Sequence, residues 1–246
     1  MLLGMKKLFL AFASVLVLVS VCLAALLYNP GMIKGPLERY LSGLSGYSIR
    51  LQGDLEIDLG SVTGLSVNNV HVAAPEWASS RDLAYIDRLK LNLKTTSMFA
   101  DTLLVEFLQL EGLQLKLQTS ADGANNWAST TPPTTAAPAS QQPLVIFNHL
   151  QLSNVSLRYD NDKTSAQHIL LIASLEQHQQ ADGMLLTTMS GSLNERALEY
   201  SGTIGPYTNL LNGKDISFNS SGQLGSLKIV GDGLIDCLLE PRWPRL

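Results

Sequence analysis

The side chains best suited to chemistry are few and scattered along the chain. There are four histidines and two cysteines, and no histidine has the spacing of a zinc-ligand pair. His71 and His149 fall between apolar positions of strand-like segments, which is typical of the exposed face of a sheet. Cys22 and Cys237 lie near opposite ends of the chain, so we expect neither a disulfide nor a reactive thiol.

The densest acidic set is Asp54, Glu56 and Asp58, whose alternate spacing places three carboxylates on one face of a strand. Such a face can attract a divalent cation, but it is more often simply solvated, and we expect the solvated face. Phosphate-binding glycine loops and the G-x-S-x-G nucleophile motif are missing from the sequence. The sequence therefore predicts no catalytic residues, no metal and no cofactor, and we expect a protein that is not an enzyme.

The amino-acid composition narrows the possible classes of protein further. Of 246 residues, 46% are hydrophobic and 15% are charged, whereas a soluble domain usually carries about 25% charged residues. The net charge of -4 argues against a nucleic-acid partner, because phosphates are neutralised by clustered Lys and Arg. What remains is an apolar, charge-poor protein that is globular or membrane-associated.

Residues 8–28 predict a transmembrane anchor, because they contain no charged side chain. About 20 helical residues span roughly 30 Å, the thickness of the bilayer core. Lys6 and Lys7 precede the run, so the positive-inside rule places residues 1–7 in the cytoplasm and the body outside it. A cleaved signal peptide is the alternative, although its apolar core is usually only about 7–15 residues. Residues assigned to the anchor include Leu8, Leu16, Leu27 and Tyr28.

A short helix is predicted from Gly31 to Ser45. Pro36 suits its first turn and Gly46 suits its end. Its apolar residues recur at helical spacing and form one face; they are Ile33, Leu37, Tyr40, Leu41 and Leu44. We expect this face to pack on the following sheet, with a helix lying on the membrane surface as the alternative.

Beyond Tyr47 the apolar residues occupy every second position, the pattern of strands with one apolar and one wet face. The pattern extends to Ile169, Leu171, Ala173 and Leu175. We predict that the alternating leucines line one continuous groove. Its candidate lining residues are Leu55, Ile57, Leu89, Leu91, Leu93, Leu113, Leu115, Leu117, Val155 and Leu157.

An eight-residue unit of the form apolar-x-apolar-x-small-apolar-x-apolar occurs three times. The copies begin at Leu65, Leu108 and Leu150, which are 43 and 42 residues apart. In each copy the alternation changes parity, at Asn69, Gly112 and Asn154, and Asn and Gly tolerate the backbone of a β-bulge. A repeat of this length predicts an elongated, stacked β architecture.

The organisation follows from these patterns. We predict a first β segment with its short helix over 29–127, a linker over 128–143 and a second β segment over 144–235. The linker contains four prolines and no large apolar residue, so it cannot bury itself. The last residues, 236–246, break the alternation and are interpreted as an irregular tail and a candidate truncation point.

A one-sided sheet must have its apolar face covered, and the sequence predicts too little helix to do so. A folded-over second sheet is one solution. An open trough that holds acyl chains is the other, since each buried CH₂ contributes about 0.8 kcal/mol.

Four segments together resemble the N-terminal part of the AsmA-like proteins of Gram-negative bacteria. They are the anchor with its helix and residues 46–55, then 70–78, 84–91 and 122–127. Residues 70–78 are similar to the family's V-x-[VL]-A-N-P-x-W-A, with Ala74 at the usual Asn, and residues 122–127 to its D-G-x-x-N-W. The motif residues given a structural role are Pro75, Trp77, Asp122, Gly123, Asn126 and Trp127.

The resemblance implies a mainly β fold: a transmembrane helix, a short helix and then an elongated, curved antiparallel sheet shaped like a taco. It implies a protein of the bacterial inner membrane with a periplasmic body, which binds or transports phospholipid in outer-membrane biogenesis. Phospholipid, the inner membrane and outer-membrane assembly proteins are its implied partners. The alternatives are an assembly partner without lipid carriage and a truncated, non-functional form.

Overall fold

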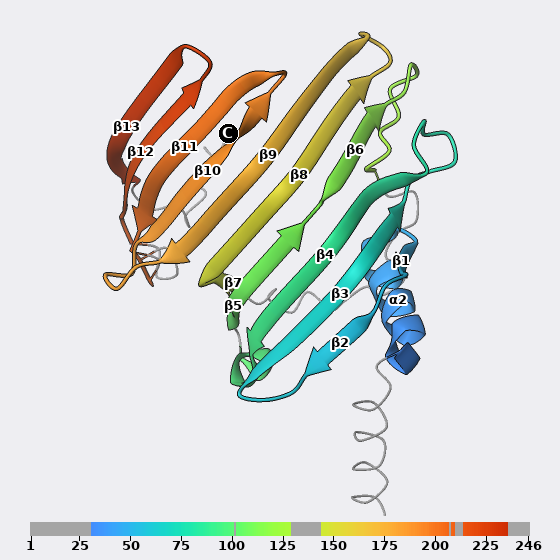
Figure 1. The fold of residues 1–246 in the computed structure, drawn as a ribbon, viewed down its shortest axis with the longest axis horizontal. Coiled ribbons are helices and arrows are strands. Elements are labelled where there is room, and N and C mark those ends of the chain that lie inside the picture. The colour runs from blue at the N-terminus through green and yellow to red at the C-terminus, as the bar shows by residue number, and fades with distance from the viewer. Residues whose placement is uncertain (1–30, 101, 129–143, 207, 210–213, 236–246) are drawn as a thin grey trace, which may run out of the picture.

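The computed structural model describes residues 31–100, 102–128, 144–206, 208–209 and 214–235. They form one sheet of 13 strands with helix α2 (Gly31–Ser45) and the short helix η1 (Thr95–Phe99), as Figure 1 shows. The predicted anchor over 8–28, nearly all of the 128–143 linker and the 236–246 tail lie outside these residues. Within the described ranges, no helix has the length and apolarity needed to cross a bilayer.

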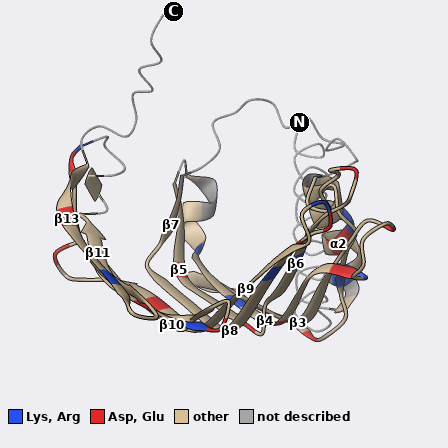
Figure 2. Ribbon diagram, turned by 90° about the horizontal axis from the view of Figure 1, so that it is seen from above, with Lys and Arg blue, Asp and Glu red and all other residues tan. Residues whose placement is uncertain are grey.

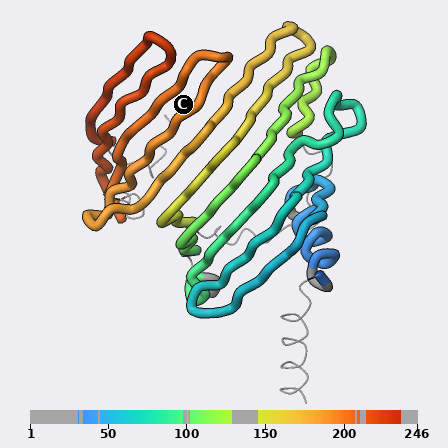
Figure 3. Tube along the Cα trace, in the orientation of Figure 1, coloured from blue at the N-terminus to red at the C-terminus, as the bar shows by residue number. Residues whose placement is uncertain are grey.

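The strands follow one another across the sheet nearly in chain order, from the edge beside α2 to the opposite edge (Figure 3). They are β1 (Ile49–Leu51), β2 (Leu55–Asp58), β3 (Val62–Ala73), β4 (Asp82–Lys94), β5 (Thr102–Glu111), β6 (Gln114–Thr119), β7 (Leu144–Phe147), β8 (His149–Asn161), β9 (Ala166–Gln179), β10 (Leu185–Leu193), β11 (Arg196–Gly205), β12 (Ile216–Leu224) and β13 (Leu227–Ile235). The sheet curves into a trough that is open along one side (Figure 2). The expected mainly β, curved fold with a short helix at its start is thus confirmed.

The expectation of a wholly antiparallel sheet is wrong, because the sheet is mixed. β5 pairs in parallel with β7 and β8, and β6 pairs in parallel with β8. Every pair in this seam is offset by 42 residues, from Thr102 opposite Leu144 to Thr119 opposite Asn161. The long connection after β6 allows the chain to return to the same end of the sheet, as parallel pairing requires. The second and third copies of the repeat therefore lie side by side in register.

The predicted changes of parity coincide with left-handed backbone. Asn69, Gly112 and Asn154 have φ of 53°, 66° and 53°. The residues just before them, Asn68, Glu111 and Ser153, belong to one row across the sheet, so the three irregularities form a transverse crease. Arg88 of β4 lies in the same row, between Asn68 and Glu111. No register shift occurs at this row between β3, β4, β5–β6 and β8. Each of these strands therefore changes there which of its alternate residues face the same side of the sheet.

The crease ends between β9 and β10. There the register shifts at Gly191, and β9 holds one more residue than β10. A side chain at Gly191 would place its Cβ only 2.0 Å from the carbonyl oxygen of Leu171, so the close approach of the two strands requires glycine. The bulge lets β10 to β13 continue with simple alternation.

Helix α2 covers the β1 part of the first edge of the sheet. Leu37 packs against a core of Leu51, Leu55, Val67 and Val70, as expected. Tyr40, which the spacing also assigned to the packing face, is instead 65% exposed. Polar side chains of the same helix also bind the backbone of the edge. The carboxylate of Glu38 accepts a hydrogen bond from the Leu51 N–H at 2.6 Å, and the Ser42 hydroxyl accepts one from the Ile49 N–H at 2.9 Å. The Lys34 ammonium donates to the Gly53 carbonyl.

The crease can be tested at Gly112. Gly112→Ala forces a left-handed φ on an L-residue and places a Cβ 1.8 Å from a carboxylate oxygen of Asp87. We expect the free energy of unfolding to fall by about 1–3 kcal/mol, measured by urea denaturation. The control is Gly43→Ala in α2, where no atom outside the helix backbone lies within 4 Å of the new Cβ and stability should rise slightly. Equal effects of the two substitutions would contradict the strained crease.

Candidate functional site

The ten candidate groove residues all lie on one face of the sheet. Residues paired across neighbouring strands share a face, and one such row runs Ile57–Leu65–Leu91–Leu108–Leu150. A second row joins Leu115 to Leu157 and then to Leu170. We call this side the trough face. It is the side on which α2 packs, and it faces the inside of the curve (Figure 2).

The candidates differ in how far they are covered. Leu55 is 4% exposed beneath α2 and Val155 is 7% exposed, so both belong to closed parts of the core. The other eight are half-buried, with part of each side chain open to the trough. All described strands belong to a single sheet, so no second sheet covers these side chains in the described part of the chain. Among the described residues, the apolar face beyond α2 therefore remains uncovered.

In β9 the residues that lie on the trough face differ from the predicted alternation. Leu170 and Ile172 pair with Leu157 and Val155 and therefore lie on the trough face, together with Leu175. Leu171 pairs with Ser156 on the other side and is 45% exposed. The predicted set of Ile169, Leu171, Ala173 and Leu175 is wrong because the crease crosses β9 at Ala173 and reverses the parity there.

Toward β13 small residues occupy the middle of the trough face, while one end stays apolar, with Leu198, Leu224 and Leu227 in one row. In the middle, Gly202, Ser220, Gly222 and Gly231 replace the leucines. Aromatic rings cover some of the glycines: Phe218 reaches within 3.1 Å of a Cβ placed at Gly233. The leucine-rich part of the trough face therefore extends from β2 to β9.

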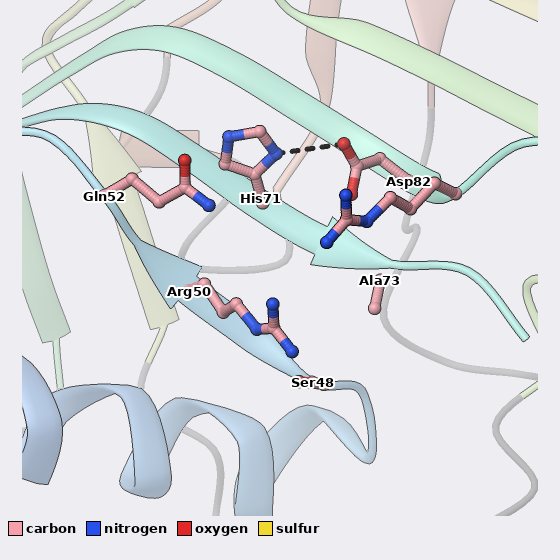
Figure 4. A pocket seen from close by; sticks show the side chains of 7 residues that line it. Ser48, Arg50, Gln52, His71, Ala73 and Asp82 are labelled. Atoms are coloured by element: carbon pink, nitrogen blue, oxygen red, sulfur yellow. Dashed lines mark hydrogen bonds and ion pairs between the residues drawn. The ribbon is translucent and has the colours of Figure 1, made fainter.

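The outer face carries the charged alternate positions. Asp54, Glu56 and Asp58 are exposed, as expected of a solvated face. His71 lies 2.9 Å from Asp82 and lines a shallow polar pocket with Arg50 and Gln52 (Figure 4). Within the described ranges no three His, Cys, Asp or Glu side chains are grouped so that they could hold a metal ion.

The D-G-x-x-N-W motif forms a turn that folds back on β6. Asn126 is 1% exposed; its amide oxygen accepts from the Gln118 N–H and its amide nitrogen donates to the Lys116 carbonyl, both at 2.8 Å. Gly123 has φ of 92°. A hydrogen bond from the Ser120 hydroxyl lowers the pKa of the Asp122 carboxyl, so this acceptor stays ionised.

Gln118 ties the motif to two other loops at the same end of the sheet. Its amide oxygen accepts from the Ser79 N–H at 2.8 Å, in the loop that holds Pro75 and Trp77. Its amide nitrogen donates to Asp162 at 2.7 Å, in the β8–β9 turn. Trp127 packs edge-on against Tyr159 of the trough face, with ring centroids 5.9 Å apart. The sequence pattern missed Gln118, because it occupies an ordinary polar position of a strand.

A comparison with models of protein families agrees with this architecture. The model of the AsmA family matches residues 1–203. The chain belongs to the AsmA family. The match includes both tryptophan motifs, the three repeat copies and the parallel seam, and it ends within β11. A search of curated proteins finds no match. The AsmA resemblance drawn from the motifs is confirmed.

Asn126 provides a test of the loop cluster. Asn126→Ala leaves the Gln118 N–H and the Lys116 carbonyl without their buried partner. We expect the free energy of unfolding to fall by about 2–4 kcal/mol, measured by urea denaturation. Asn219→Ala, at an exposed position of β12, is the matched control and should change stability little. Similar losses in both variants would argue against a specific role for the Asn126 amide.

Proposed function

We propose that this AsmA-family protein is anchored in the bacterial inner membrane and holds phospholipid acyl chains against its trough face in the periplasm. The observation that carries the proposal is the continuous, half-buried leucine surface from β2 to β9, which no second sheet covers in the described residues. Family membership supports a role in outer-membrane biogenesis. No catalytic residue and no cofactor enters the proposal.

The chemistry of the trough face suits an acyl chain better than a polar ligand. Side chains such as Leu91, Leu115 and Leu157 offer no hydrogen-bonding groups, and the charged positions Lys90, Lys116 and Arg158 alternate with them onto the outer face. A hydrocarbon chain needs no directional partner, and its binding grows by about 0.8 kcal/mol for each CH₂ removed from water. The polar headgroup would stay in solvent along the open side of the trough.

Residues 8–28 supply the membrane anchor in this proposal, with residues 1–7 in the cytoplasm. The topology is testable with a fusion at Asp122, because a fluorescent protein that matures only in the cytoplasm should stay dark there. A bright fusion would overturn the periplasmic placement.

Lipid contact can be mapped with a photo-crosslinking amino acid. We would place p-benzoylphenylalanine at Leu91, Leu115 or Leu157, and at the neighbouring outer-face positions Lys90, Lys116 or Arg158 as matched controls. After irradiation of living cells, mass spectrometry should find phospholipid adducts at the first set and few at the second, because neighbouring residues of a strand face opposite sides.

Two outcomes would contradict the proposal. Equal adducts on both faces would show contact with bulk membrane rather than a bound lipid. Absence of lipid at all three trough positions, with the protein folded, would leave the leucine surface for a protein partner instead.

A further inference from the structure

The outer face of the sheet carries a pocket that takes no part in the trough. It has a volume of about 210 Å³ and lies where β1, β3 and the start of β4 meet (Figure 4). Its polar lining includes Arg50 and Gln52 of β1, His71 of β3, and Arg81 and Asp82 at the start of β4. α2 packs on the opposite face of the sheet, so the pocket is separate from the leucine surface.

The two arginines of this pocket are not neutralised by a neighbour. Asp82 contributes a carboxylate, but its oxygen lies 2.9 Å from Nδ1 of His71. A carboxylate only accepts hydrogen bonds, so His71 is the donor in this pair. Arg50 and Arg81 have no ion pair among the described residues. Two guanidinium groups therefore line the pocket with no carboxylate bonded to either.

Other pockets on the outer face are less suited to an anion. In one of them the guanidinium of Arg158 is already bonded to Asp160 at 2.7 Å. In another, Glu56 and Asp58 accompany Lys90. An anion entering either pocket would have to compete with a carboxylate for the cation.

The backbone that carries both arginines is fixed. Side chains of α2 accept hydrogen bonds from the N–H groups of Ile49 and Leu51, the two neighbours of Arg50. The Arg81 carbonyl accepts a hydrogen bond from the Ala74 N–H at 3.0 Å, across the base of the β3–β4 loop. Binding would thus have to order only the side chains, which lowers its entropic cost.

We propose that this pocket binds a dianionic phosphoryl group, as free phosphate or as a phosphate monoester. A guanidinium binds phosphate oxygens through paired hydrogen bonds. Arg50 and Arg81 come from different elements, so they can bind different oxygens of one tetrahedral group, and the Gln52 amide adds a neutral donor. A phosphate monoester carries close to two negative charges at pH 7, which matches two guanidinium groups. A phosphodiester carries one charge and would match them less well.

The test uses the full-length chain in dodecyl maltoside, in a phosphate-free buffer of constant ionic strength, so that general screening does not change. Isothermal titration with sodium phosphate should give one saturable site per chain. Arg50→Gln and Arg81→Gln should each weaken this binding by about tenfold, because each removes a charged hydrogen-bond donor. Both side chains are exposed, so the variants should fold, and urea denaturation checks this.

Arg158→Gln is the matched control. It makes the same change of net charge on the same face of the sheet, but at a guanidinium that is already bonded to Asp160. Phosphate should bind this variant as tightly as it binds the native chain.

Two further ligands identify the source of the phosphoryl group. Glycerol 3-phosphate that binds more tightly than inorganic phosphate would support an esterified ligand, such as a lipid headgroup. Equal affinities would support free phosphate. Glycerophosphoethanolamine, a phosphodiester, should bind about tenfold more weakly than glycerol 3-phosphate.

Three outcomes would overturn the proposal. Absence of saturable phosphate binding to the native chain would remove the site. Equal weakening by Arg158→Gln and Arg50→Gln would show diffuse attraction to positive charge instead of a pocket. A diester that binds as tightly as the monoester would refute the assignment to a dianion. The pocket and the trough lie on opposite faces, so lipid adducts at Leu91 and Leu115 do not depend on any of these results.

Discussion

Side-chain alternation is the constraint on which the apolar face depends. A strand presents every second residue to one side, so a single change of parity would send half of its leucines into solvent. Here the change occurs in the sequence, and the left-handed backbone at Asn69, Gly112 and Asn154 compensates for it. Leu65 and Leu108, before the crease, therefore share a face with Val70 and Leu115, after it. Without that row of residues the trough would have no continuous lining.

A one-sided sheet has two further requirements: its apolar surface must be covered, and the backbone groups of its edges must find hydrogen-bond partners. α2 meets both at one end: Leu37 covers the core around Leu55, while Glu38 and Ser42 bind the edge backbone. At the distal ends of the strands, Asn126 and Gln118 hold three loops together through buried amide hydrogen bonds. Between these fixed points the leucines pack beside one another across neighbouring strands.

Much of this could be predicted from the sequence, because alternation is a local property. The leucine positions, the helix over Gly31–Ser45 and the three parity changes were all visible as spacing. The parallel seam was not, since strand direction depends on where the chain returns after β6. Residues Ile169 to Ile172 are all apolar, so spacing could not assign their faces; only pairing with β8 does so. Gln118 also escaped, because its role comes from three loops that meet in space.

The parallel seam has a consequence for how such a molecule can vary. Copies one and two of the repeat are separated by a strand, β4, whereas copies two and three are direct neighbours joined by the connection from Thr119 to Leu144. The copies are thus almost equally far apart along the chain, but the number of strands between neighbouring copies differs. Asn126 fixes the start of this connection to β6, so a change of length after Trp127 would leave the described pairing of the sheet unaltered. The seam is therefore a natural point for insertions.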